Sequence, residues 1–399
     1  MTGVRFGELH GAMRDLVDTE ILAGVSTAVL VNGELADLHC AGWADREAGI
    51  ALRPDHVFRV FSQTKLVTSC AALQLMEEGR FELDDPIGRH LPELAGLRVL
   101  KPDARSIDDT EAARSPVTVR HLLSHTAGFA HGLLDPGTLL FDAYARTGVR
   151  DPNRTLQEMV QVLSGLPLVF HPGTAWHYST ATDVVARLVE VLSGEPLGDY
   201  FHRRIFAPLG MGQTGFVVAP QDRSRLVAYY VGASREDPWK PGLSRSDDAP
   251  YPGAYLEPFA LQAGGSGLVS TLPDTIALLR SLMPGGFGLL QPRTISLMMT
   301  NQLGAGLRVS FPGVAPTPGK GFGLSGAVTL QPFTDDPPQS TGDLEWGGIA
   351  GTHWWISPAN NVAGIVMAQR EWAFWHPFSL LLKRLVYQAA LPSTGTPQA

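Results

Sequence analysis

The stretch Val60-Phe61-Ser62-Gln63-Thr64-Lys65-Leu66 opens a long apolar segment that ends at Gly79. The apolar residues after Lys65 keep helical spacing, and a glycine is typical of a helix C-terminus. On a helix, Ser62 and Lys65 would lie on the same face, one turn apart. The free N–H groups of the first turn and the positive end of the helix dipole would favour an oxyanion above Ser62. The pattern therefore predicts a serine nucleophile with Lys65 as its base.

Composition sets limits on the class of protein. The chain has 399 residues, is 44% hydrophobic and 18% charged, and carries a formal net charge of -8. This length predicts one large domain or two closely joined ones, and the acidic balance argues against a nucleic-acid binder. No run approaches the ~20 apolar residues of a membrane span, and the polar start lacks the features of a secretory signal, so we expect a cytoplasmic protein. Cys40 and Cys70 lie in apolar runs, which indicates reduced core residues.

Strand patterns occur near both ends of the chain. An amphipathic helix over 6–19 precedes two strands, 25–31 and 35–41, around the hairpin dipeptide Asn32-Gly33. Residues 43–54 are interpreted as turn-rich, and the first sixty residues are expected to supply sheet edges. Further strands are expected at 323–330, 343–347, 352–357 and 362–369, and a closing helix at 377–390.

The middle of the chain is interpreted as mainly helical. Helices are expected at 117–124, 156–163, 181–192 and 196–206, with an exposed polar stretch at 101–116 and a long surface loop or lid at 235–258. The pattern predicts an α+β fold: an antiparallel sheet from the N- and C-terminal segments, flanked by helices, with a helical insertion. We expect a discontinuous sheet domain (1–80 and 257–399) and a helical domain (81–256), with the active site at their interface.

Two other stretches contain candidate site residues. In 171–180, Tyr178 precedes a helix and could project its phenol toward a lysine as a proton shuttle, or it could be a core tyrosine bonded to a carbonyl. In Glu345-Trp346-Gly347-Gly348-Ile349-Ala350-Gly351-Thr352, the glycines indicate a close approach of backbone, either to a ligand carbonyl or within a tightly packed sheet. Several other aromatic residues could line an apolar pocket or pack in the core: Trp354, Trp355, Trp372, Phe374 and Trp375.

Together, Ser-x-x-Lys, Tyr-Ser-Thr and Trp-Gly-Gly resemble the penicillin-recognising serine hydrolases, which include class C β-lactamases, D-alanyl-D-alanine peptidases and their esterase relatives. The closest resemblance is to the family VIII carboxylesterases, with a β-lactamase-like fold. Further phrases of the chain carry the same resemblance: Phe58-Arg59-Val60-Phe61, Leu122-Leu123-Ser124-His125-Thr126-Ala127-Gly128 and Pro208-Leu209-Gly210-Met211.

The resemblance implies a role for each matching residue. Ser62 would be the nucleophile, Lys65 its activating partner, and Tyr178 the general base in acylation. The backbone N–H groups of Ser62 and Ile349 would form the oxyanion hole. Trp346, with Gly347 and Gly348, would line the substrate pocket on the acyl side.

Trp346 also marks a departure from the lactamases. They carry Lys-Thr-Gly where this chain has Trp-Gly-Gly, and Tyr-x-Asn where it has Tyr-Ser-Thr, so both changes favour neutral esters over anionic lactams. The resemblance thus implies a cofactor-free serine carboxylesterase (EC 3.1.1.-) that hydrolyses small or medium esters through a Ser62 acyl-enzyme. The alternatives are a β-lactamase or D-alanyl-D-alanine peptidase-like hydrolase, an acyltransferase of the same fold, and a non-enzymatic acylation sensor.

Two further patterns resemble catalytic motifs but lack an essential residue. The Gly-x-Ser-x-Gly elbow is absent, because Gly264-Gly265-Ser266-Gly267-Leu268 falls short of it. His121 and His125 have zinc-helix spacing but Leu122 where the glutamate would stand, so we expect no metal site. The expected partner is a small-molecule ester, with neither nucleic acid nor membrane, and the sequence predicts no particular oligomeric state.

Overall fold

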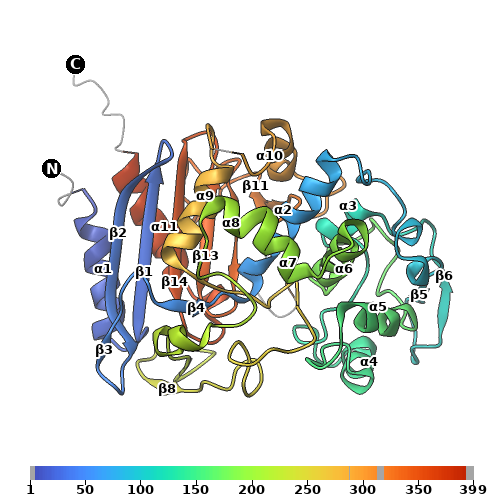
Figure 1. Cartoon of the computed structure of the whole chain (residues 1–399), viewed down its shortest axis with the longest axis horizontal. Helices are drawn as coiled ribbons and strands as arrows, with labels where there is room; N and C mark the ends of the chain where they lie inside the picture. The colour runs from blue at the N-terminus through green and yellow to red at the C-terminus, as the bar shows by residue number, and fades with distance from the viewer. Residues whose placement is uncertain (1–4, 287, 312–318, 392–399) are drawn as a thin grey trace.

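The computed structural model describes residues 5–286, 288–311 and 319–391. Figure 1 shows a sheet with the two terminal helices at one side of the molecule, helices α3 to α6 (within 119–193) at the other side, and α2 (Thr64–Glu77) between them. In the described ranges, no helix is long and apolar enough to cross a membrane.

One antiparallel sheet joins the two ends of the chain. Its strand order is β10-β11-β12-β13-β14-β1-β2-β3. The strands are β1 (Gly24–Val31), β2 (Glu34–Asp45), β3 (Ile50–Ala51), β10 (Lys320–Phe322), β11 (Ala327–Thr329), β12 (Leu344–Gly348), β13 (Thr352–Ser357) and β14 (Val362–Ala368). β1 pairs with β14 from Val25↔Ala368 to Val31↔Val362, so the N-terminal hairpin continues the C-terminal strands. The predicted α+β sheet built from both termini is confirmed.

Two expectations about the N-terminal strands hold only in part. β1 lies inside the sheet between β14 and β2, so only β2 and β3 lie toward the edge. Residues 43–54 are not simply turns, because β2 continues to Asp45 and pairs with β3 through Trp43↔Ala51. A two-residue strand is too short to show a period-2 pattern, and the neighbouring glycines conceal it.

Helices cover both faces of the sheet. On one face lie α1 (Gly7–Asp18) and α11 (Phe378–Ala390), which pack around Val25 and Val29. On the other face lie α2 (Thr64–Glu77) and α9 (Leu272–Leu282), whose apolar residues share a core with Ala28 and Leu30. Alternate residues of β1 therefore face two different cores, as the pleat requires.

The remaining elements form the helical part of the chain and its connections. The other helices are α3 (Val119–Leu123), α4 (Leu139–Thr147), α5 (Leu156–Ser164), α6 (Ala181–Ser193), α7 (Leu197–Phe201), α8 (Ala207–Leu209) and α10 (Pro292–Met299). The short helical turns are η1 (Phe61–Gln63), η2 (Ile87–Arg89), η3 (Pro92–Leu94), η4 (His202–Phe206), η5 (Pro220–Arg225) and η6 (Ala373–Trp375). The two-stranded pairs are β4 (Val57–Arg59) with β9 (Val269–Thr271), β5 (Arg98–Leu100) with β6 (Thr110–Ala112), and β7 (Tyr230–Gly232) with β8 (Leu243–Arg245).

The helical part also departs from expectation in places. α4 was not predicted, although Thr138 caps it by accepting from the Phe141 amide. The polar stretch 101–116 contains a strand, β6. The division into a sheet domain and a helical domain stays a prediction.

Candidate active site

Ser62 lies in the turn that joins β4 to α2. The sequence pattern predicts a serine in the first turn of the helix, but α2 begins at Thr64 and Ser62 belongs to the preceding 3₁₀ turn η1. Phe61 has a φ of 43°, a left-handed conformation that is strained for a bulky side chain. Its ring is held near Tyr229 and Tyr255, with centroids 5.9 and 6.0 Å away. This tight turn leaves Ser62 half-buried at the wall of a cavity.

Lys65 reaches Ser62 from the first turn of α2. Its Nζ donates to Gly265 O at 2.7 Å and to Ser62 Oγ at 3.3 Å. Lys65 Nζ also lies 4.6 Å from the centroid of the Tyr178 ring. In the described ranges it forms no ion pair, so a buried lysine is held by neutral acceptors and an aromatic face.

The Gly264-Gly265 segment holds the lysine in place. Thr68 Oγ1 donates to Gly264 O at 2.7 Å, and the Gly265 amide donates to Asp183 Oδ1 at 2.8 Å. A Cβ on Gly265 would lie 3.0 Å from the Asp183 carboxylate and 3.3 Å from Lys65 Nζ. This segment therefore packs between the lysine and a buried carboxylate, where a larger residue would have to displace one of these two side chains by a few tenths of an ångström.

Tyr178 approaches from the loop before α6. That loop is pinned by backbone bonds from His177 N to His125 O and from Thr180 N to Ala130 O. His125 Nδ1 lies 3.3 Å from the Ser179 amide, and burial holds the pKa of His125 well below its usual range. The neutral imidazole can therefore accept that hydrogen bond and fix the backbone next to Tyr178.

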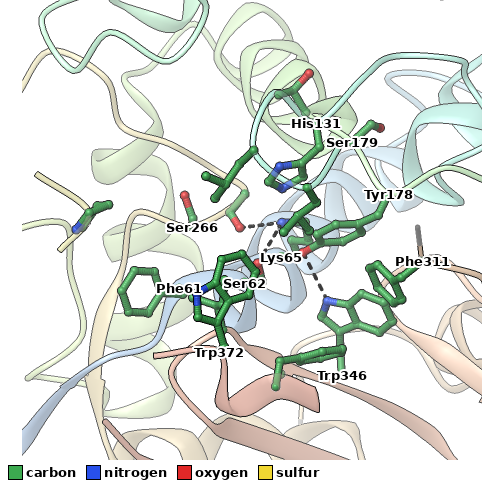
Figure 2. Close-up of a pocket in the computed structure, with 18 of the residues that line it drawn as sticks. Phe61, Ser62, Lys65, His131, Tyr178, Ser179, Ser266, Phe311, Trp346 and Trp372 are labelled. Atoms are coloured by element: carbon green, nitrogen blue, oxygen red, sulfur yellow. Dashed lines mark hydrogen bonds between the residues drawn. The ribbon is translucent and has the colours of Figure 1, made fainter. Parts of the chain in front are cut away.

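The phenol of Tyr178 meets Trp346. The indole Nε1–H of Trp346 donates to Tyr178 Oη at 3.4 Å, as Figure 2 shows. The Tyr178 ring also packs against His125 and His131, with centroids 4.8 and 5.2 Å away. Tyr178 is thus held by aromatic neighbours, and its oxygen contacts the indole of the third predicted motif.

The glycines of that motif serve the packing of β12. A Cβ on Gly348 would lie 2.3 Å from Val60 O, the same carbonyl that accepts from Thr352 Oγ1 at 3.1 Å. Gly348 therefore holds the β12–β13 hairpin against the residue two positions before Ser62. Trp346, Gly347 and Ile349 line the cavity around Ser62, whereas Gly348 does not.

The Ser62 cavity, as we call it, encloses about 230 Å³. The predicted residues Ser62, Lys65, Tyr178, Trp346 and Ile349 all line it. Of the further aromatic candidates, Trp372, Phe374 and Trp375 line it, but Trp354 and Trp355 do not. Sequence reasoning missed Phe311, His131 and Asp183, which also line it. Among these three residues, only Asp183 belongs to a recognisable sequence pattern, as an ordinary acidic residue in the first turn of α6.

Residues 9–373 match the sequence profile of a known family, the beta-lactamases. The chain belongs to the beta-lactamase family. Within it, the chain is similar to Esterase EstB of Burkholderia gladioli, with 31% identity over 382 residues, 92% of this chain and 91% of the relative. The predicted resemblance, the β-lactamase-like fold and the assignment as a serine hydrolase are confirmed at this level.

Solved structures of beta-lactamase-like proteins superpose over nearly the whole chain. EstCE1, described as a hydrolase with promiscuous acyltransferase activity, has a TM-score of 0.81 and 27% identity, over 96% of this chain and 98% of that one. The simvastatin synthase LovD from Aspergillus terreus has a TM-score of 0.82 and 26% identity, over 98% of this chain and 99% of that one. The structural neighbours of this chain thus include a protein described as a hydrolase with promiscuous acyltransferase activity and a protein named as a synthase.

Proposed function

We propose that the protein is a serine carboxylesterase that hydrolyses small or medium carboxylic esters through an acyl-enzyme on Ser62. The observation that carries this proposal is the hydrogen-bonded contact of Ser62 with Lys65 beside Tyr178, in a cavity whose far wall is tryptophan where lactamases have lysine. An esterase relative at 31% identity over most of the chain supports it.

Acylation follows from this arrangement. Ser62 Oγ attacks the ester carbonyl while its proton passes to the Lys65–Tyr178 pair. The backbone N–H groups of Ser62 and Ile349 would stabilise the oxyanion of the tetrahedral intermediate. Collapse of the intermediate breaks the bond to the alcohol oxygen, which leaves with the proton held by the pair.

Deacylation uses the same groups in reverse. A water molecule takes the place of the alcohol and gives a proton to Tyr178 as it attacks the acyl carbonyl. The acid leaves, and the proton returns to Ser62 Oγ. No metal ion or cofactor is needed for either half of this cycle.

A second candidate function is acyl transfer to an alcohol or amine. The names of EstCE1 and LovD favour this candidate, because both relatives are described by transferase or synthase activity. The Ser62 cavity is walled by Phe311, Trp346 and Phe374, and an apolar wall lowers the access of water. Product partition with and without added acceptor alcohol distinguishes transfer from hydrolysis.

The lactamase-like and sensor alternatives remain less supported. A β-lactamase or peptidase would need a cation where Trp346 stands. An acylation sensor would accumulate a stable adduct instead of releasing acid, which intact mass spectrometry would detect.

Steady-state hydrolysis of p-nitrophenyl butyrate and nitrocefin tests the proposal. Wild type should turn over the ester much faster than the lactam, and Ser62→Ala should lose both activities. Ser266→Ala, a change at another serine of the cavity, should keep most ester turnover. Lactam turnover equal to ester turnover would contradict the assignment of ester specificity.

A further inference from the structure

The Ser62 cavity has two unlike ends. Its strand side is apolar, formed by Phe311, Trp346 and Phe374. The rest of its lining includes the polar and charged side chains of His131, Arg150, Asp183 and Glu371, together with Leu133 and Leu134. A bound ester would have one portion against each end, so the polar end requires a matching group on the substrate.

His131 is a buried polar group without a partner. Its side chain is 7% exposed, and its Nδ1 is buried without a hydrogen bond in the described structure. Burial holds the pKa of His131 well below its usual range, and the nearby Arg150 and Lys65 charges act in the same direction. The ring is therefore neutral, with one N–H to donate. Figure 2 shows it beside Lys65 and Tyr178.

The loop that carries His131 is fixed before any ligand arrives. Asp135 Oδ2 accepts from the His131 amide at 3.2 Å, and Asp135 Oδ1 accepts from the Gly132 amide at 2.8 Å. Burial alone would raise the pKa of Asp135, but hydrogen bonding with His177 and with these two amides holds it below its usual value. The charged Asp135 thus holds the imidazole in position against the Tyr178 ring.

Arg150, an exposed residue, supplies a cation to the same cavity. It lines both the Ser62 cavity and a neighbouring cavity of about 300 Å³. Within the described residues its guanidinium makes neither an ion pair nor a hydrogen bond. Asp183 lines both cavities too, but its Oδ1 is occupied by the Gly265 amide, and Glu257 of the second cavity is paired with Arg223 at 3.3 Å.

We propose that this end of the Ser62 cavity binds a carboxylate carried by the ester substrate, with Arg150 as its ion-pair partner and His131 as a neutral hydrogen-bond donor. An arginine fork matches a carboxylate geometrically, and a preformed donor beside it adds direction. This inference rests on the proposed esterase function and names its substrate class: esters with a free carboxylate in the acid part or the alcohol part.

Two isosteric substrate pairs test the inference. Ethyl hydrogen adipate against ethyl hexanoate places the carboxylate in the acid part, and 6-acetoxyhexanoate against hexyl acetate places it in the alcohol part. The readout is the ratio of kcat/KM for the anionic ester to that for its neutral partner, measured at pH 7.5. Wild type should favour the anionic member of at least one pair.

The variants separate the two side chains. Arg150→Gln should lower the favoured ratio by about tenfold, the loss expected for a charge-assisted contact. His131→Phe keeps the stacked ring and should lower it by roughly threefold, whereas His131→Gln should retain more of it. Arg146→Gln, an exposed arginine of α4 outside both cavities, is the matched control and should leave the ratio unchanged.

The outcomes also separate this inference from the proposed function. Neutral esters that turn over in all variants, with ratios unaffected by Arg150→Gln, would overturn the carboxylate site and leave the esterase intact. Ratios below one for both pairs in wild type would overturn it as well. If wild type hydrolyses no ester of either pair, both the esterase proposal and this inference fail.

Discussion

Tyr178 Oη has one hydrogen-bond donor in the described structure, the indole N–H of Trp346 at 3.4 Å. The lactamases that the sequence resembles have a lysine at the position of Trp346, which is a cation near the phenol. Here a neutral N–H takes that place, so it can stabilise developing charge on the phenol oxygen without placing a cation at this position. At the scale of single residues, Trp346 therefore has two roles, as an apolar wall and as a donor.

Trp346→Phe separates these roles, because it keeps an aromatic ring and removes the N–H. We expect kcat for p-nitrophenyl butyrate to fall about three- to tenfold, the effect of one lost hydrogen bond, with little change in KM. Steady-state kinetics check this. A raised KM with unchanged kcat would mean that Trp346 acts only as a wall.

Among the elements, the Gly264-Gly265 segment links α2 to α6. It accepts from Lys65 and Thr68 on α2 and donates to Asp183 on α6. The position of the lysine therefore depends on how these two helices pack, and a small change in the segment should alter catalysis more than stability.

Gly265→Ala tests that dependence. The added Cβ would meet Asp183 at 3.0 Å and Lys65 Nζ at 3.3 Å, so we expect kcat/KM to fall by at least about tenfold, because small misplacements of catalytic groups are costly. Gly212→Ala is the control, since a Cβ there meets nothing within 4 Å. Steady-state kinetics and thermal unfolding of both variants test whether catalysis falls more than stability. Equal activity of the two variants would contradict the role of the segment.

An aromatic wall separates the Ser62 cavity from another cavity of about 370 Å³ over β12 and α11. Phe311, Trp346, Phe374 and Trp375 line both. Phe374→Ala should join the two spaces and shift the preferred acyl chain from butyrate toward decanoate. Hydrolysis of a series of p-nitrophenyl esters of increasing acyl length measures the preferred chain length. An unchanged preference would show that neighbouring side chains fill the space left by the Phe374 ring.

At the scale of the whole molecule, the structural features predicted best from sequence are those set by residues close together along the chain. Asn32-Gly33 takes positive φ values of 54° and 77°, as a tight hairpin needs, and Ser62 and Lys65 lie one turn apart. The missed features depend on residues distant in sequence. Asp183 meets Gly265 across 82 positions, and the left-handed Phe61 that sets the serine turn packs on Tyr229 and Tyr255. Local propensity cannot predict such contacts.

Buried histidines should make stability depend on pH. Burial lowers the pKa of His125 and His131 well below the usual value and that of His376 to about 4. Between these values and the unfolded pKa near 6.5, the unfolded chain binds more protons, so stability falls as pH drops below about 6.5. We expect the free energy of unfolding to fall by about 1 kcal/mol or more per pH unit from pH 6 to 5.

Urea unfolding of two variants checks the cause. His376→Gln can keep a hydrogen bond to Pro238 O and should make the pH slope shallower. His202→Gln, at an exposed position, should leave the slope unchanged. A flat profile in wild type would contradict the neutral buried histidines.

The central claim is that Ser62 carries the acyl group. The most direct measurement is rapid-quench mass spectrometry in the first turnovers of p-nitrophenyl butyrate, on the wild type and on Ser62→Ala. We predict a butyryl adduct on the peptide that contains Ser62 in the wild type, and none in Ser62→Ala. An adduct on another residue, or an equal adduct without Ser62, would contradict the account.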